Sequence, residues 1–266
     1  RARALGAHDR AIARFIVQAL FTTVTNVNFD PERLGQQVRQ AAALRDRARQ
    51  LYADACAKAG RTPETLTGPA TWQPADSLPG LIQQGEAVSI LGRKQSLGDD
   101  LTGLQELLTY GAKGAAAYAE HARILGVETD EAYAFFAEAL DALTVAQPTV
   151  DQLLPLNLRC GAANLKVMEM LDTAHTGTYG HPVPTPVRVE PIPGKAIVVS
   201  GHDLRDLELL LQQTAGKGIN VYTHGEMLPA HGYPKLKAYP HLVGNYGGAW
   251  QDQADEFDKF PGAVLM

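Results

Sequence analysis

Two short apolar runs rich in β-branched residues constrain the fold of this chain more than any other feature. Residues 196–199 and 219–223 each have the length and composition of a strand that is buried on both faces. Between them, residues 203–213 carry leucines at helical spacing, and Gly216 and Gly218 mark the end of that helix. Because a strand, a helix and a second strand in succession require a crossover connection, the pattern predicts a parallel β-sheet.

The same alternation continues to the end of the chain. A third, weaker strand is expected at residues 241–243, and a helix is expected at residues 249–260. The last apolar run, residues 263–266, has the composition of the next strand, so the chain is expected to stop inside an unfinished sheet. We therefore predict that residues 186–266 form the first part of a doubly wound parallel-sheet (Rossmann-like) domain, truncated at its C-terminus.

Residues 1–173 follow a helical pattern instead. Helices are expected at residues 11–20, 31–60, 98–125, 129–145 and 149–170, with a proline-rich surface connection at residues 61–80 and a bend or break at Pro155. Residues 1–185 are therefore predicted to form a helical bundle domain with an architectural role, and the fold class is α plus α/β. The first residues resemble the inside of a helical region, so this domain is expected to be truncated at its N-terminus.

Three local features of the helical part lead to specific expectations. Asp30 and Pro31 supply an N-cap and a proline at the first position of a long helix. Residues 112–119 have small side chains, which permit close approach to a neighbouring helix. Cys56 and Cys160 have no second cysteine at the short spacing of a zinc or iron–sulfur site, so both are expected to be packing residues.

Charge and hydropathy limit the classes of partner. The formal net charge of -5 and the pI near 5.9 leave no basic field for nucleic acid or for an acidic membrane surface. No apolar run reaches the roughly 18 residues of a membrane-spanning helix, and residues 1–14 lack the apolar core of a signal peptide. We therefore expect a cytoplasmic protein that binds neither nucleic acid nor membrane.

Polar side chains follow the first two predicted strands directly. His202 lies just after one strand and Glu226 just after the next, each beside a glycine that permits a sharp turn. If the two strands are neighbours, both side chains lie at the same sheet edge, roughly 5–10 Å apart given a strand spacing of ~4.8 Å. An imidazole and a carboxylate at this position are consistent with an acid–base pair or with two ligands of an iron-type metal.

The same residues also have purely structural interpretations. Ser200 or Asp203 can cap the following helix, and His202 can hydrogen-bond a carbonyl group. His224 and His231 enlarge the polar cluster but are not expected to be ligands. The glycine-rich residues 244–248 match no phosphate-binding motif, and the chain has no GxSxG nucleophile motif.

Several stretches of unusual residues in fixed order resemble the hybrid-cluster (prismane) proteins. The similarity is densest at residues 199–204, 220–234 and 241–247, and further similar stretches are residues 22–30, 110–118 and 177–182. The resemblance therefore spans almost the whole chain and identifies it as an internal piece of a hybrid-cluster protein.

The resemblance implies a cofactor, a ligand set and an activity. It implies an iron–sulfur–oxygen hybrid cluster for which His202 and Glu226 are ligands, and a second iron–sulfur cluster in the intact protein. Neither the cluster cysteines nor the later glutamate ligand lies in this chain, and the next cysteine ligand is expected just beyond Met266, so the piece alone is expected to be inactive. The implied activity is the two-electron reduction of hydroxylamine to ammonia and water, or reduction of nitric oxide, with electrons from a redox partner.

Two alternatives remain open. A carbon monoxide dehydrogenase-like enzyme would place a nickel–iron cluster at a comparable strand edge, although the run from Thr223 to Met227 favours the hybrid-cluster branch. A non-catalytic module that combines a helical part with an α/β part would bind no iron.

Overall fold

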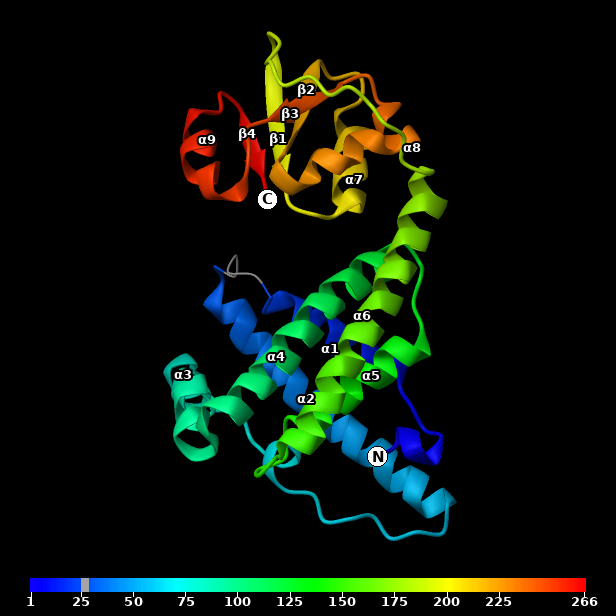
Figure 1. Cartoon of the computed structure of the whole chain (residues 1–266), viewed down its shortest axis with the longest axis vertical. Coiled ribbons are helices and arrows are strands. Elements are labelled where there is room, and N and C mark those ends of the chain that lie inside the picture. The colour runs from blue at the N-terminus through cyan, green and yellow to red at the C-terminus, as the bar shows by residue number, and fades with distance from the viewer. Residues whose placement is uncertain (25–28) are drawn as a thin grey trace. The chain divides into compact units, whose positions relative to one another are not determined.

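The computed structural model describes residues 1–24 and 29–266 and contains two compact units (Figure 1). One unit comprises Arg1–Glu120 and Glu128–Glu169, and the other comprises His121–Val127 and Met170–Met266. Two long helices, α4 (Ile90–Ile124) and α6 (Val150–Tyr179), therefore contribute residues to both units. The domain boundary between residues 185 and 186 was inferred from sequence pattern and stays a prediction.

The first unit is helical, as the sequence predicts. Its other elements are η1 (Arg3–Leu5), α1 (Arg10–Thr22), α2 (Pro31–Lys58), η2 (Gly68–Ala70), α3 (Leu78–Glu86) and α5 (Asp130–Ala142). The predicted start of α2 is confirmed, because the Asp30 carboxylate accepts a hydrogen bond from the Arg33 amide at 3.0 Å. Residues 22–30, which carry part of the family resemblance, lie partly outside the described residues.

Three helical boundaries differ from the predicted ones. The connection expected at residues 61–80 contains the start of α3, which Ser77 caps. Helix α4 begins before its predicted start and has non-helical backbone at Gly98, where φ is 80°. Helix α6 is continuous through Pro155 and ends only before Gly180, whose φ of 86° terminates it.

Helices α4 and α6 approach each other closely where Gly111 faces Cys160. A Cβ added to Gly111 would lie 2.8 Å from the Cys160 Sγ, so only glycine fits there without movement. Both cysteines are buried, which confirms their predicted packing role, and burial raises the pKa of the Cys160 thiol. The small side chains of α4, Ala112, Ala115, Ala116 and Ala119, are buried as the pattern predicts.

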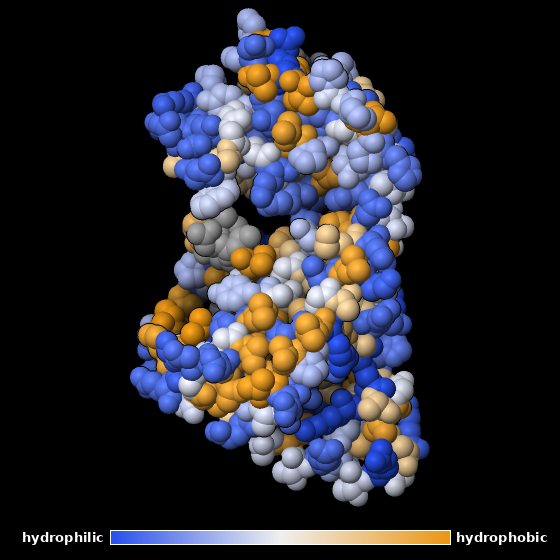
Figure 2. Space-filling model, in the orientation of Figure 1, coloured by the Kyte–Doolittle hydropathy of each residue, from blue (hydrophilic) through white to orange (hydrophobic). Residues whose placement is uncertain are grey.

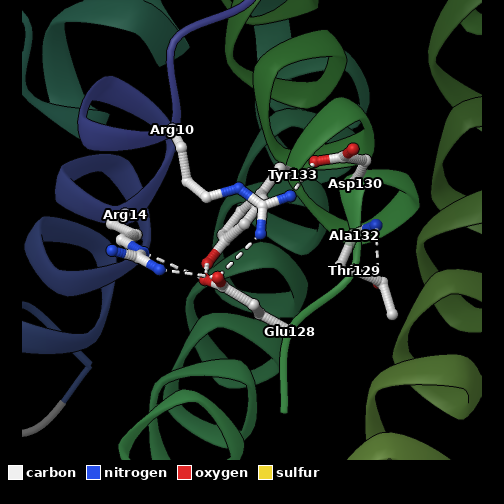
Figure 3. Close-up of polar contacts among 7 residues, drawn as sticks. All are labelled: Arg10, Arg14, Glu128, Thr129, Asp130, Ala132 and Tyr133. Carbon is white, nitrogen blue, oxygen red and sulfur yellow. Dashed lines mark hydrogen bonds and ion pairs between the residues drawn. The ribbon is translucent and has the colours of Figure 1, made fainter. Parts of the chain in front are cut away.

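A half-buried carboxylate, that of Glu128, joins α1 to the start of α5 (Figure 3). Glu128 accepts hydrogen bonds from Arg14 Nη2 at 2.6 Å, Arg10 Nη1 at 2.7 Å and the Tyr133 hydroxyl at 2.5 Å. These bonds, that from Arg14 foremost, lower the pKa of Glu128 to about 2. Burial and the neighbouring Glu128 raise the pKa of Tyr133 to about 12.

The second unit contains a parallel sheet of four strands. The strands are β1 (Lys195–Ser200), β2 (Ile219–His224), β3 (Leu242–Tyr246) and β4 (Ala263–Leu265), in the spatial order β3-β2-β1-β4. The other elements are α7 (Leu204–Thr214), η3 (Gly225–Gly232), α8 (Pro234–Lys237), η4 (Trp250–Asp252) and α9 (Gln253–Lys259). This strand order is that of the first half of a doubly wound fold, so the predicted fold class is confirmed.

Helices cover both faces of this sheet, α7 and α8 on one side and α9 on the other (Figure 1). Val199 and Val221 pack with the leucines of α7. Val198 and Tyr222, each adjacent in its strand to one of these residues, pack on the opposite face with Phe260. Because successive side chains of a strand point to opposite faces, the continuous apolar runs in the sequence correspond to strands buried on both sides.

Among the described residues, none of the helices combines the length and the hydropathy that a membrane crossing requires.

Candidate functional site

The two residues expected at the sheet edge are brought together. Ser200 and His224 are the last register partners of β1 and β2. After each strand the backbone turns through a glycine with positive φ, Gly201 at 128° and Gly225 at 53°. The next residues are His202 and Glu226, and their Nε2 and Oε2 atoms lie 2.5 Å apart. The two side chains therefore lie at one sheet edge as expected, but they are closer than the expected 5–10 Å.

This edge is the usual position of a ligand site in a doubly wound sheet. The chain builds the sheet outward from β1 to β3 and then returns to place β4 on the other side of β1. Ligands of such sheets bind beyond the carboxyl ends of the strands, at the point where the strand order reverses. His202 follows β1, one of the two strands at that point.

The pair fits part of an iron site. Donors about 2.0–2.2 Å from one metal ion stand about 3 Å apart, so a small separation of the two side chains would allow both to bind the same ion. Imidazole and carboxylate are both donors that iron accepts. Both side chains are more than half exposed, 56% for His202 and 66% for Glu226, so further donors can reach them. Among the described residues, no group of three or more His, Cys, Asp or Glu side chains has the arrangement of a metal site.

The turn after β1 lies between the two residues that could cap the following helix, Ser200 and Asp203. Asp203 caps α7, because its carboxylate accepts hydrogen bonds from the amides of Arg205 at 2.7 Å and Asp206 at 3.4 Å. The Ser200 hydroxyl instead contacts His224. The His202 ring bonds to the Glu226 carboxylate, where a purely local role would have given it a carbonyl partner.

His224, the last residue of β2, is buried, and both of its ring nitrogens are bonded. Its Nδ1 lies 3.1 Å from the Ser200 Oγ, and its Nε2 lies 2.7 Å from the Glu256 Oε2. The hydrogen bond from His224 lowers the pKa of Glu256. The Phe257 ring packs edge-on against the imidazole, with ring centroids 4.8 Å apart.

His231 is also buried, and it belongs to a second set of hydrogen bonds, with Thr223 of β2 and Asn245 of β3. Its Nε2 lies 2.9 Å from the Thr223 Oγ1, and that hydroxyl also lies 2.9 Å from the Asn245 Oδ1. Burial lowers the pKa of His231. The histidine thus ties η3 to β2 and β3, and both it and His224 are buried.

The glycine-rich turn after β3 surrounds the Glu256 carboxylate. The Gly248 amide donates a hydrogen bond to Glu256 Oε1 at 2.8 Å. A Cβ added at Gly247, where φ is 74°, would lie 2.5 Å from the Glu256 Oε2. Sequence reasoning missed Glu256, which lies 32 residues after His224. A glycine-rich turn followed by a carboxylate on the next helix is the one sequence signal that precedes the contact between Glu256 and His224.

The chain is similar to known proteins along its whole length. The sequence model of the Prismane/CO dehydrogenase family matches residues 2–266. A protein named hydroxylamine reductase from Rhodospirillum rubrum is 58% identical over 266 residues, which are 100% of this chain and 48% of that protein. Proteins of the same name from Acidiphilium cryptum and Geobacter sulfurreducens are 54% and 50% identical, again over 100% of this chain and 48% of theirs. The chain thus spans about half the length of the curated relatives it matches.

Proposed function

Because the chain belongs to the Prismane/CO dehydrogenase family, we propose that the intact protein is a hydroxylamine reductase. The reaction is NH2OH + 2 e− + 2 H+ → NH3 + H2O. The proposal is supported by relatives of that name, which are 50–58% identical to this chain over its whole length. The 266 residues alone, which include two of the proposed ligands, are expected to be inactive.

His202 and Glu226 are the residues through which this chain takes part. Their convergence to 2.5 Å at the carboxyl edge of the sheet is the observation that carries the assignment. The two side chains bind iron of a hybrid iron–sulfur–oxygen cluster as nitrogen and oxygen donors. When bound, that cluster supplies an iron with exchangeable oxygen ligands, at which an N–O bond can be polarised. A second iron–sulfur cluster of the intact protein would be bound by other residues, not by this pair.

The exposure of the pair favours ligation over acid–base catalysis. General acids and bases are usually tuned by burial, whereas His202 and Glu226 are 56% and 66% exposed. An open pair accepts further metal ligands from other segments of the polypeptide. The His202 imidazole would hold the cluster through one nitrogen, and the Glu226 carboxylate would hold it through oxygen.

The first prediction tests the ligand assignment in the intact protein. His202→Ala or Glu226→Ala is expected to remove or remodel the hybrid cluster while leaving the second cluster in place, because each change deletes one donor. Iron analysis and low-temperature EPR on anaerobically purified protein measure both clusters in the same sample.

His241→Ala is the matched control for these two variants. His241 bonds to Thr214 Oγ1 at 3.0 Å at the opposite, amino-terminal edge of the sheet. This variant should keep both EPR signals. Unchanged hybrid-cluster signals in both the His202 and the Glu226 variants would overturn the assignment.

The family description also covers carbon monoxide dehydrogenase, which defines the second candidate function. That activity would require nickel and would oxidise carbon monoxide, so nickel analysis and an assay with each substrate separate the two enzymes. A non-catalytic module would contain no iron, and substitution of His202 would change nothing measurable.

The physiological setting follows from the same proposal. We propose a cytoplasmic enzyme that receives electrons from a dedicated redox partner, and nitric oxide as a second substrate under nitrosative stress. The net charge of -5 supports the absence of nucleic acid and acidic membrane among its partners.

A further inference from the structure

The hydrogen bonds of His224 have one consistent direction. An ionised carboxylate only accepts hydrogen bonds, so the His224 Nε2 carries the proton that faces Glu256. In the neutral ring the Nδ1 is then an acceptor, and the Ser200 hydroxyl donates to it. The Gly248 amide donates to the second carboxylate oxygen. Both ring nitrogens of buried His224 and both carboxylate oxygens of partly exposed Glu256 therefore have a partner.

The hydrogen-bonded residues Ser200, His224 and Glu256 lie next to the two turns that carry the proposed ligands. Ser200 and His224 are register partners, and His202 and Glu226 each lie two residues beyond one of them. Both intervening residues are glycines with positive φ, which give the turns little stiffness of their own. The bond between Ser200 and His224 is thus the last side-chain link between paired residues of β1 and β2 before the two turns begin.

Glu256 anchors this link to a third element. It lies on α9, which covers the opposite face of the sheet from α7, and its carboxylate holds His224 from that side. The His224 side chain is 1% exposed and that of Glu256 is 21% exposed, so the imidazole side of the contact is shielded from water. The positions of β1, β2 and α9 at the carboxyl edge are therefore coupled through one imidazole ring.

We propose that His224 is a positioning residue that fixes the separation of His202 and Glu226 through Ser200 and Glu256. The proposal rests on the assignment of those two residues as iron ligands. Groups that orient ligands typically change metal affinity or activity 10–100-fold when they are replaced. We expect a loss in that range from breaking the link, without loss of the fold.

Ser200→Ala in the intact protein is the sharpest test, because it removes one oxygen atom and leaves the imidazole bonded to Glu256. It should speed loss of the hybrid-cluster EPR signal to a chelator by roughly tenfold or more. It should also alter the shape of that signal before chelation. The signal of the second cluster, measured in the same tube, should not change. Ser200→Thr keeps the hydroxyl and should restore the behaviour of the parent protein.

His224→Ala and His241→Ala complete the series. The first should give the larger change, and thermal unfolding of each purified variant shows whether its fold is retained. The second removes a histidine whose Nε2 contacts Thr214 Oγ1 and the Leu211 carbonyl at the other sheet edge, and it should leave the signal and its chelation rate unchanged.

The outcomes separate this inference from the proposed function. If His202→Ala and Glu226→Ala abolish the hybrid-cluster signal while Ser200→Ala matches the parent protein in shape and chelation rate, the positioning role is wrong and the ligands stand. If Ser200→Thr is as impaired as Ser200→Ala, the hydroxyl is not the cause and the inference also fails. If the two ligand variants leave the signal intact, the proposed function itself fails.

Discussion

Glu128 of the helical unit has a pKa that its hydrogen-bond partners lower to about 2. Two arginines of α1 and the Tyr133 hydroxyl donate to one carboxylate that is 15% exposed. Charge-assisted hydrogen bonds of this kind stabilise a fold only while the carboxylate is ionised. The contact therefore makes the attachment of α1 dependent on pH.

Glu128→Gln should destabilise the helical unit near pH 7 by about 1–2 kcal/mol, because it removes the charge that both arginines face. The folded pKa is about 2, against an ordinary value of 4.5. Since the folded pKa is lowered, the stabilisation is present above about pH 5 and is lost as the pH falls towards 2. Urea unfolding followed by circular dichroism at pH 7 and pH 3 should show the difference between the two proteins shrinking at the lower pH.

Glu138→Gln is the control for this measurement. Glu138 pairs with Arg159 on the surface, where the side chains are 46% and 58% exposed. Such pairs contribute about 0.5 kcal/mol or less. A pH-independent effect of Glu128→Gln, or an equal effect of both changes, would contradict the role assigned to Glu128.

At the residue scale, the sequence predicts contacts that strand register determines and misses those that depend on packing. His202 and Glu226 follow consecutive strands, so strand spacing alone places them at one edge. Glu128 meets Arg10 across 118 residues, and Glu256 meets His224 across 32. No local pattern specifies which carboxylate faces which cation or ring in such cases.

Gly111→Ala tests the closest helix contact of the first unit. The added methyl group would lie 2.8 Å from the Cys160 Sγ, so either the Cys160 side chain or the two helices must shift. Overpacking of this kind typically costs about 1–3 kcal/mol, and the better helix propensity of alanine returns up to about 1 kcal/mol of that. We expect a net loss of about 1–2 kcal/mol, measured as a lower Tm.

Gly114→Ala is the matched control on the same helix. A Cβ there meets nothing within 4 Å, so the substitution should stabilise the protein by up to about 1 kcal/mol through helix propensity. Equal Tm changes in the two variants would contradict the packing explanation.

At the element scale, the sequence predicts the strands and most helices, and the errors have identifiable causes. The prolines of residues 61–80 suggested a continuous connection, although Ser77 followed by Pro79 is itself a helix start. Helix α6 ends at Gly180 with positive φ, a stop signal that lies beyond the predicted end. The site was unaffected, because its turns are defined by β1 and β2.

On the scale of the whole molecule, an apolar surface lies on the helical unit. Figure 2 shows apolar residues gathered over α4 and α6. Leu154, Leu158 and Leu165 of α6 are 47%, 71% and 57% exposed, and Leu107 and Tyr110 of α4 are 62% and 55% exposed. Exposed apolar surfaces of this kind promote association.

Leu158→Lys combined with Leu165→Lys should therefore reduce self-association of the isolated 266-residue chain. Sedimentation velocity at several concentrations, with binding of an apolar dye, measures the effect. Leu153→Lys is not a useful control, because Leu153 is 1% exposed and its replacement would disrupt the core. Arg159→Lys, which lies on the same helix and keeps its charge, should leave association unchanged. A double variant that associates as strongly as the parent chain would refute the prediction.

The architecture of the second unit was predictable because its sheet repeats one simple unit. Three of the four strands, β1, β2 and β4, contain an apolar run, and each crossover begins or ends with a capping or glycine residue. The strand order was not predictable from the runs alone, because β4 pairs with β1 on the side opposite β2. That order is set by packing of the whole sheet and by the handedness of crossover connections.

The register of Ser200 with His224 has a consequence for insertions and deletions in this protein. Both proposed ligands are counted from the ends of paired strands, so one residue added within β1 or β2 would move its ligand by about 3.3 Å and turn it to the other face. Residues 215–218, which connect α7 to β2 at the other edge, are under no such constraint. Insertion scanning should therefore find length changes tolerated between α7 and β2 and rejected in residues 199–202 and 223–226.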